Sequence, residues 1–360
     1  MKISAVTAHV VSVPFTSGGP PSSFAGRPWT KLDILLVRID TSDGITGWGE
    51  AFGHAATPST HVALESVIVP LLIGKDTRDV PAIMREMKHK LHLLGRSGPY
   101  MYALSGVDIA LWDIAGKRAG KPLHQLLASS AAEQLDGYAS LVWYGDLELV
   151  ERNTAAAVAA GFGHIKLHEV TKESVSIATA AADGGKIMLD TNCPWSVDEA
   201  VGMARALKGS LFWLEEPVWP PEDYESLARV RAEGTPIAAG ENAAGFFDFK
   251  RMFELEAVDI AQPSITKIGG VTEMLRIVEL AEAHDVHIMP HSPYFGPGFL
   301  ATLHLSAVMK KRPLIEMLWI DMESSPFDPW VRPQGGRFSV PQGPGLGCDP
   351  DMETLKRYAT

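Results

Sequence analysis

The chain has 360 residues, of which 46% are apolar and 21% charged, a composition typical of a globular protein that excludes disordered and fibrous classes. Its formal net charge is −11 and it contains no basic run, so the charge pattern of a nucleic-acid-binding protein is missing. No apolar run approaches the roughly 18 residues of a membrane span. The two cysteines, Cys193 and Cys348, are too few for a disulfide scaffold and favour a cytoplasmic location.

The first third of the chain mixes strand and helix patterns. Alternating or apolar runs predict strands over 2–13, 31–40 and 47–50, and longer periodic stretches predict helices over 60–71, 79–95 and 99–119. Between the first two strands, residues 16–27 (TSGGPPSSFAGR) are rich in Gly, Pro and Ser. This composition predicts a long loop, which in a compact domain is either mobile or functional.

From about Gly137 onward, short apolar runs alternate with amphipathic helical stretches. Eight strands are predicted: 138–144, 164–168, 186–190, 211–215, 236–240, 259–262, 287–290 and 314–317. Strict alternation of strands and helices implies parallel pairing, and eight such units predict an α/β fold with a closed TIM-type barrel. After Asp321 the chain is rich in Pro and Gly and ends in a predicted helix over 350–358, which we expect to pack on the N-terminal domain.

Three successive predicted strands end in carboxylates. Asp190, Glu215 and Glu241 follow one another at spacings of 25 and 26 residues, about one βα unit each. Adjacent strands lie about 4.8 Å apart, so these groups would converge at the edge where such barrels carry their chemistry. Carboxylates this close repel one another unless a cation lies between them, and hard oxygen ligands suit Mg²⁺. The pattern therefore predicts a magnesium site.

Basic residues flank these carboxylates. Lys166 and His168 end the preceding strand, whereas Lys267 and His291 follow later strands. This order would put proton donors and acceptors on opposite faces of a metal-bound anion. Mg²⁺ bound to a substrate carboxylate makes the α-proton more acidic by stabilising the enediolate that forms, and the acids and bases on either face decide the product.

Several segments together resemble the enolase superfamily, in its mandelate racemase and muconate lactonising enzyme branch. They are ALSGVDIALWDIAGK over 103–117, continuing through KPL over 121–123, then LEEP over 214–217, GEN over 240–242, KIGGVT over 267–272 and GPGLG over 343–347. Ala128 stands where the family usually has glycine. The resemblance covers essentially the whole chain. It implies a capping domain over 1–125, a barrel over 126–321 and a C-terminal segment over 322–360 that returns to the cap.

The resemblance also implies roles for single residues. Asp190, Glu215 and Glu241 would bind Mg²⁺, and Asn192 and Glu316 would contact the substrate. The loops over 16–27 and 52–59 would close over the substrate and set specificity. Candidate contacts from that side are Phe24, Trp29 and His54.

Two further departures from the family pattern concern catalytic positions. The second strand carries Lys-x-His where the family usually has Lys-x-Lys, so Lys166 matches the group that neutralises the substrate carboxylate and His168 matches the base. Neutral histidine is a competent base near pH 7. Ser264 stands where the racemase subgroup has the aspartate partner of its histidine, here His291. Without that carboxylate His291 should be less basic, and Lys267 could substitute for it.

The leading hypothesis is a Mg²⁺-dependent dehydratase of a sugar acid or related hydroxy acid, with His291 or Lys267 protonating the leaving hydroxyl. The alternatives are a racemase, epimerase or cycloisomerase of a carboxylate, and a metal-binding barrel with weakened catalysis. The expected partner is a small-molecule carboxylate, with neither nucleic acid nor a membrane. The resemblance further implies a symmetric homo-oligomer, an octamer or a dimer.

Overall fold

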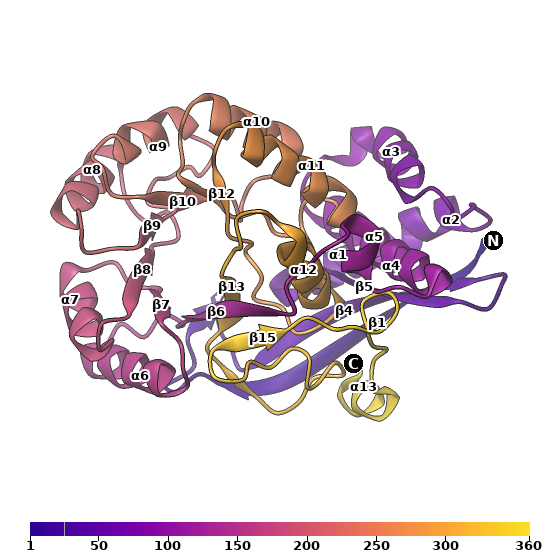
Figure 1. The fold of residues 1–360 in the computed structure, drawn as a ribbon, viewed down its shortest axis with the longest axis horizontal. Coiled ribbons are helices and arrows are strands. Elements are labelled where there is room, and N and C mark those ends of the chain that lie inside the picture. The colour runs from indigo at the N-terminus through magenta and orange to yellow at the C-terminus, as the bar shows by residue number, and fades with distance from the viewer. Residues whose placement is uncertain (25) are drawn as a thin grey trace.

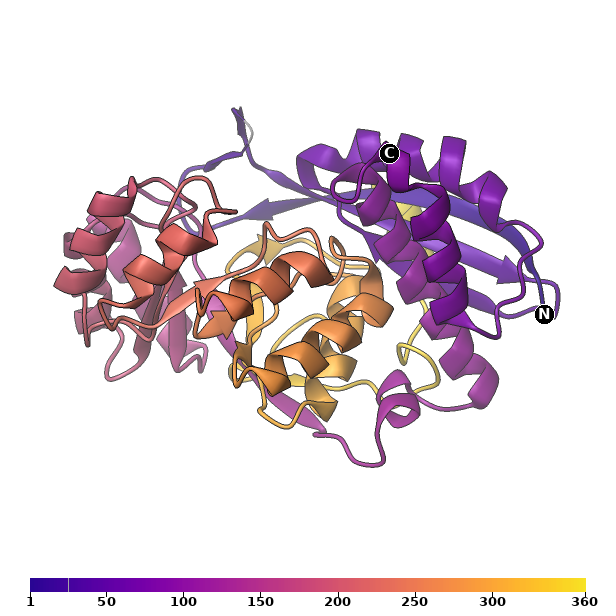
Figure 2. The same cartoon turned by 90° about the horizontal axis from the view of Figure 1, so that it is seen from above.

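The computed structural model of the protein describes residues 1–24 and 26–360, and Phe24 by its backbone alone. The fold has two parts, a mixed sheet-and-helix cap and a ring of parallel strands surrounded by helices (Figures 1 and 2). Among the described residues, no helix has both the length and the apolar character needed to cross a membrane.

The cap is built on an antiparallel sheet. Strands β1 (Ile3–Thr16), β4 (Lys31–Thr41) and β5 (Thr46–Ala51) pair in that order, and the short β14 (Asp321–Met322) extends the free edge of β1. A small hairpin, β2 (Ser23–Phe24) and β3 (Arg27–Pro28), interrupts the connection between β1 and β4.

The helices of the cap pack on one another and on this sheet. They are α1 (Thr57–Ala63), α2 (Val69–Leu72), α3 (Val80–Lys90), α4 (Pro99–Ala119) and α5 (Leu123–Leu127). The single helix predicted over 60–71 is divided by one π-helical turn, Leu64–Ile68. β5 approaches α4 so closely that a Cβ on Gly49 would lie 1.9 Å from the carbonyl oxygen of Gly106. Glycine at position 49 is therefore a steric requirement of the cap.

The barrel contains the eight predicted parallel strands. They are β6 (Gln134–Ser140), β7 (His164–Leu167), β8 (Lys186–Asp190), β9 (Trp213–Glu215), β10 (Ile237–Ala239), β11 (Ile260–Ala261), β12 (His287–Ile288) and β13 (Ile315–Leu318). Their hydrogen-bonded order runs from β12 back to β6 and then to β13. At the junction between β12 and β13, the backbone N–H of Leu314 contacts Met289 Sδ at 3.2 Å. The predicted fold class is confirmed.

Helices follow the strands and form the outer layer of the ring, most clearly in Figure 1. They are α6 (Leu147–Ala159), α7 (Lys172–Ala181), α8 (Val197–Ala206), α9 (Tyr224–Arg231), α10 (Phe246–Glu254), α11 (Gly270–Ala283) and α12 (Pro297–Val308). Inward-facing side chains fill the ring: Tyr138, Met188, Trp213, Ala238, Ile260 and Met289. The barrel therefore has a packed centre, and the accessible chemistry lies at its carboxyl-terminal edge.

Cap and barrel are joined by buried contacts. Helix α12 is apolar on all sides and packs against α4, α5 and β5 of the cap as well as against β6. The C-terminal segment touches both parts, because β15 (Arg337–Ser339) pairs with β6 whereas α13 (Met352–Tyr358) contacts β1. These contacts hold the cap beside the edge of the barrel where the predicted site residues gather.

Candidate active site

Lys166 lies at the centre of a buried carboxylate cluster. It points inward from β7, and its Nζ lies 3.2 Å from Asp190 Oδ2, 2.9 Å from Glu215 Oε1 and 2.9 Å from Glu316 Oε1. Burial alone would lower the pKa of Lys166, but the surrounding carboxylates outweigh it and raise that pKa well above its ordinary value. Lys166 is therefore a permanent cation that balances these acids.

His168, two residues further along the chain, faces the cavity. Its Nε2 lies 3.2 Å from Asp190 Oδ2, and its Nδ1 contacts the carbonyl oxygen of Leu141. A carbonyl oxygen can only accept, so Nδ1 carries a proton and Nε2 is the nitrogen that gains or loses one. Burial lowers the pKa of His168, but the charge of Asp190 outweighs burial and raises the pKa above its usual value.

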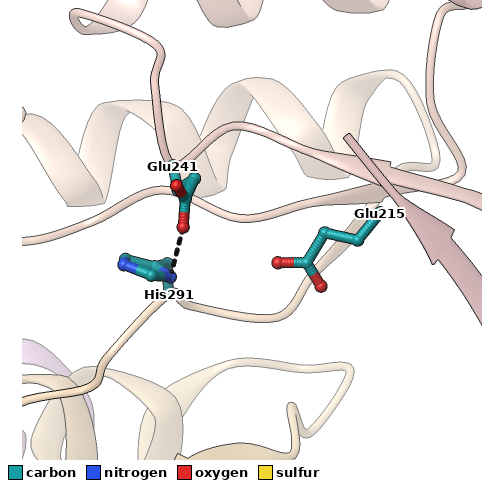
Figure 3. A group of neighbouring side chains, drawn as sticks. All are labelled: Glu215, Glu241 and His291. Carbon is teal, nitrogen blue, oxygen red and sulfur yellow. Dashed lines mark ion pairs between the residues drawn. The ribbon is translucent and has the colours of Figure 1, made fainter. Parts of the chain in front are cut away.

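A second group of candidate ligands lies beside the first. One ligand atom each from Glu215, Glu241 and His291 falls within 4.8 Å of the others, and Figure 3 shows the Glu215 carboxylate pointing toward the other two. His291 Nδ1 lies 3.0 Å from Glu241 Oε2, and Trp213 Nε1 donates to Glu215 Oε2 at 2.8 Å. Asp190, also predicted as a ligand, lies outside this group and contacts Lys166 and His168.

The charge balance of this cluster suits a divalent cation. Glu215 is fully buried, and burial together with the charge of Asp190 raises its pKa well above the ordinary value. Asp190, Glu215 and Glu316 share the single positive charge of Lys166, so the cluster has more negative than positive charge within contact distance. Bound Mg²⁺ would supply the missing positive charge through the hard oxygen ligands it prefers.

Ser264, which stands where the racemase subgroup has an aspartate, contacts a residue other than His291. The hydroxyl groups of Ser264 and Tyr294 contact each other. His291 instead has two carboxylates as neighbours, Glu241 and, at 3.3 Å, Glu316 Oε2. The acidic support of His291 therefore comes from the ends of strands β10 and β13.

Lys267 is a second basic residue beside Glu241. Its Nζ donates to the backbone carbonyl of Glu241 at 3.1 Å and lies 4.6 Å from the ring centroid of Phe52. Burial raises the pKa of Glu241, but His291 and Lys267 outweigh burial and lower that pKa to about 2. Glu241 is therefore ionised at neutral pH.

The cap contributes an aromatic wall. The ring of His54 lies 5.6 Å from that of Trp29 and 5.1 Å from that of Phe52. His54 has a left-handed backbone with φ of 52°, which is uncommon for a side-chain-bearing residue. Burial, with the charge of Lys267, lowers the pKa of His54 to about 3, so its imidazole is neutral at pH 7.

A cavity of about 500 Å³ brings most of the predicted residues together. Those that line it are Trp29, His54, His168, Asn192, Glu241, Lys267, His291 and Glu316. Lys166, Asp190 and Glu215 are buried and contact residues of the lining. The side chain of Phe24 lies outside the described residues.

Sequence reasoning missed further residues of the site. Glu216 is buried, accepts from Asn242 Nδ2 at 2.6 Å, and has a pKa raised to about 8 by burial and by the charge of Glu241. Both residues stand in the LEEP and GEN segments, so their position beside the carboxylates could have identified them. Trp143 and Ser23 also line the cavity; Ser23 belongs to the predicted loop over 16–27, whereas no chemical pattern in the sequence marks Trp143.

The chain is similar to known proteins along nearly its whole length. Residues 5–128 match the mandelate racemase / muconate lactonizing enzyme N-terminal domain, and residues 148–354 match the enolase C-terminal domain-like family. The chain is 31% identical to D-galactarolactone cycloisomerase of Agrobacterium fabrum, over 99% of both proteins. It is also 31% identical to arabinonate dehydratase of Saccharolobus solfataricus, over 88% of each.

A solved structure is also similar to this chain over nearly its whole length. A racemase from Streptomyces coelicolor A3(2) with bound magnesium superposes with a TM-score of 0.85 at 27% identity, covering 99% of this chain and 100% of the other. Both parts of the fold and nearly the full length of the sequence are therefore matched. The chain belongs to the mandelate racemase and muconate lactonizing enzyme branch of the enolase superfamily.

Proposed function

We propose that the protein is a Mg²⁺-dependent dehydratase of a sugar acid or related hydroxy acid. The observation that carries this proposal is the placement of two histidines in one cavity, each beside a different carboxylate: His168 beside Asp190, and His291 beside Glu241. Dehydration needs one group to take a proton and another to give one to the departing hydroxyl. A similar dehydratase of a sugar acid, from Saccharolobus solfataricus, supports the substrate class.

His168 is the proposed base. Its Nδ1 is held by the carbonyl oxygen of Leu141, which leaves Nε2 to take the proton α to the substrate carboxylate. Asp190, 3.2 Å from Nε2, then stabilises the imidazolium. Lys166 is a poor candidate for this step because three carboxylates hold it as a cation away from the cavity.

His291 is the proposed acid. It lines the cavity, and its Nδ1 lies 3.0 Å from Glu241 Oε2 and 3.3 Å from Glu316 Oε2, so an imidazolium here would have two carboxylate partners. In that form it can donate a proton to the hydroxyl that leaves the β-carbon, giving water and an enol that becomes a 2-keto acid. Lys267, near the same carboxylate, is the second candidate for this donor.

The metal would be held by Asp190, Glu215 and Glu241. When bound, Mg²⁺ would act as a Lewis acid that makes the proton next to the substrate carboxylate more acidic. The solved racemase with bound magnesium supports this choice of ion. The chain's own residues supply the base, the acid and the charge balance around the carboxylates.

A cycloisomerase is the second candidate, and a specific observation favours it. The relative from Agrobacterium fabrum, matched over 99% of its length, is a cycloisomerase. Cycloisomerisation and dehydration both begin with removal of the α-proton. They differ in the leaving group, which is a ring oxygen in the first reaction and a hydroxyl in the second. The same pair of histidines would serve both reactions.

The test is incubation of the protein with Mg²⁺ and a panel of sugar acids and their lactones, followed by mass spectrometry. Loss of water with formation of a 2-keto acid from one or more acids is the expected result. Conversion of a lactone to an open-chain deoxy keto acid of the same composition, or incorporation of solvent deuterium without water loss, would replace the dehydratase proposal with an isomerase. Glu215→Gln is the matched inactive control.

Two further expectations belong to this proposal. A cytoplasmic location is expected from the cysteine content, and Cys193 and Cys348 are both free thiols. A homo-oligomer, an octamer or a dimer, is expected from the family resemblance.

A further inference from the structure

The cavity has two ends of different chemistry. At the charged end lie the groups that balance and move charge, among them His168, Glu241, His291 and Glu316. The rest of the lining, the uncharged end, includes Trp29, Trp143, Ser22 and Ser23, with the buried apolar side chains Val142 and Leu318. Trp143 is 54% exposed and Ser23 is exposed, so these two residues lie at the entrance.

Cationic groups are confined to the charged end. Among the described residues that line the cavity, Lys267 is the one lysine or arginine. Its ammonium is held by the backbone carbonyl of Glu241 and lies against the Phe52 ring, beside the candidate metal ligands. His54, which the cap presents between Trp29 and Phe52, is neutral at pH 7.

From this asymmetry, and resting on the proposed function, we infer that the substrate is a monocarboxylic sugar acid whose far end is uncharged. Its carboxylate would bind at the charged end, and its carbon skeleton would pack against Trp29 and Trp143 while Ser22 and Ser23 hydrogen-bond its distal hydroxyls. The aldarate made by oxidising the terminal CH₂OH of the same acid would be a poor ligand.

The reason is the cost of the second charge. An aldarate bound through its first carboxylate would put the second beside aromatic and apolar side chains, where a carboxylate loses part of its hydration without gaining a cationic partner. Glu241 and Glu316, and the net charge of −11, oppose the additional negative charge. The entrance keeps some water at this end, so we expect discrimination of at least tenfold.

The test compares matched acids by binding and by turnover. Calorimetry in the presence of Mg²⁺ gives Kd for galactonate and for galactarate, and for other six-carbon aldonates each paired with its aldarate. At least one aldonate should bind tenfold or more tighter than its aldarate. Equal or tighter binding of the aldarate in every pair would overturn the inference and leave the proposed function standing.

The binding measurement separates the two claims. An aldonate that binds selectively but is not converted would contradict the proposed function and support the inference about charge. Binding of neither class would overturn both. Arg27, in β3, is exposed in the structure. If the protein binds galactarate and Arg27→Ala loses that binding, a cation from β3 reaches the entrance. This result would also overturn the inference.

A designed cation provides a gain-of-function check. Ser23→Arg puts a guanidinium at the uncharged end and should improve galactarate binding relative to galactonate by tenfold or more. Ser23→Gln, of similar reach but neutral, is the matched control against which the improvement is measured, because it removes the same hydroxyl without adding a charge. An unchanged ratio in Ser23→Arg, with galactonate binding retained, would show that the distal group does not lie at this end.

Discussion

Glu316 joins the two sides of the site: its Oε1 lies 2.9 Å from Lys166 Nζ, and its Oε2 lies 3.3 Å from His291 Nδ1. The backbone N–H of Ser292 also donates to Oε2, at 2.9 Å. Burial raises the pKa of Glu316, but Lys166 and His291 outweigh burial and hold that pKa below its usual value. An ionised carboxylate on β13 therefore replaces, for His291, the aspartate that is missing at Ser264.

We predict that Glu316→Gln slows elimination much more than it weakens substrate binding. The amide keeps the shape and can still accept from Ser292, but it removes the negative charge that lies 3.3 Å from His291 Nδ1. A fall in kcat of about 100-fold is expected, in the range that loss of general acid catalysis gives. Steady-state kinetics across pH checks this, and an unchanged kcat would show that Glu241 alone supports His291.

Lys166→Met should make folding depend on the metal. Removing the ammonium leaves Asp190, Glu215 and Glu316 without their shared partner, and breaking a buried pair costs about 3–5 kcal/mol. Added Mg²⁺ should raise the melting temperature of this variant more than that of the wild type, because the ion supplies the missing positive charge. Thermal unfolding with Mg²⁺ and with a chelator measures the difference, and equal shifts would contradict a shared site.

The stability of the cap and barrel contact should fall as pH rises. Burial raises the pKa of Glu50 to about 8, although its bond from the N–H of Gly298, at 2.8 Å, lowers it in part. Between about pH 4.5 and 8 the folded protein therefore keeps a proton that the unfolded chain has released, so the free energy of unfolding decreases over this window. The full effect of one such group is at most about 5 kcal/mol.

Denaturant unfolding at several pH values checks this, with Glu50→Gln as the comparison. The glutamine has no proton to lose, so its unfolding free energy should vary less between pH 5 and 9. Asp108, whose pKa burial raises to about 7, contributes a slope of the same sign that remains in the variant. Parallel curves for the two proteins would mean that Glu50 is not the titrating group.

Gly49→Ala should destabilise the cap by about 3 kcal/mol, because its Cβ would overlap the Gly106 carbonyl of α4. Gly202, in α8, has open space around the corresponding position and is the matched control. Gly202→Ala should stabilise the protein by about 0.5–1 kcal/mol through helix propensity. Similar melting temperatures for the two variants would show that β5 and α4 can separate at low cost.

Much of the fold can be predicted from the sequence, because strands buried on both faces are short apolar runs separated by helical periodicity. The errors concern boundaries. The first barrel strand is Gln134–Ser140, whereas the prediction was 138–144, and the residues beyond Ser140 carry Val142 and Trp143 into the cavity wall. A run of apolar residues does not show where hydrogen bonding stops.

The site could be predicted in part, because carboxylates and bases at the ends of neighbouring strands must meet at one edge of the barrel. Which of these side chains contact one another could not be predicted. That Lys166 contacts three acids, and that His291 contacts Glu316, depends on how side chains from β7, β8, β9 and β13 point inward. The partner of Ser264, Tyr294, is distant in sequence and has no spacing that would identify it.

The central claim is that His168 removes the α-proton and His291 donates to the leaving hydroxyl, and isotope exchange in D₂O tests it most directly. With Mg²⁺ and a sugar acid that the wild type dehydrates, His168→Asn should lose both water elimination and α-deuterium incorporation. His291→Asn should lose elimination and still exchange the α-proton of unreacted substrate. Continued elimination in His291→Asn, or continued exchange in His168→Asn, would contradict these roles and assign them to Lys267 or Lys166.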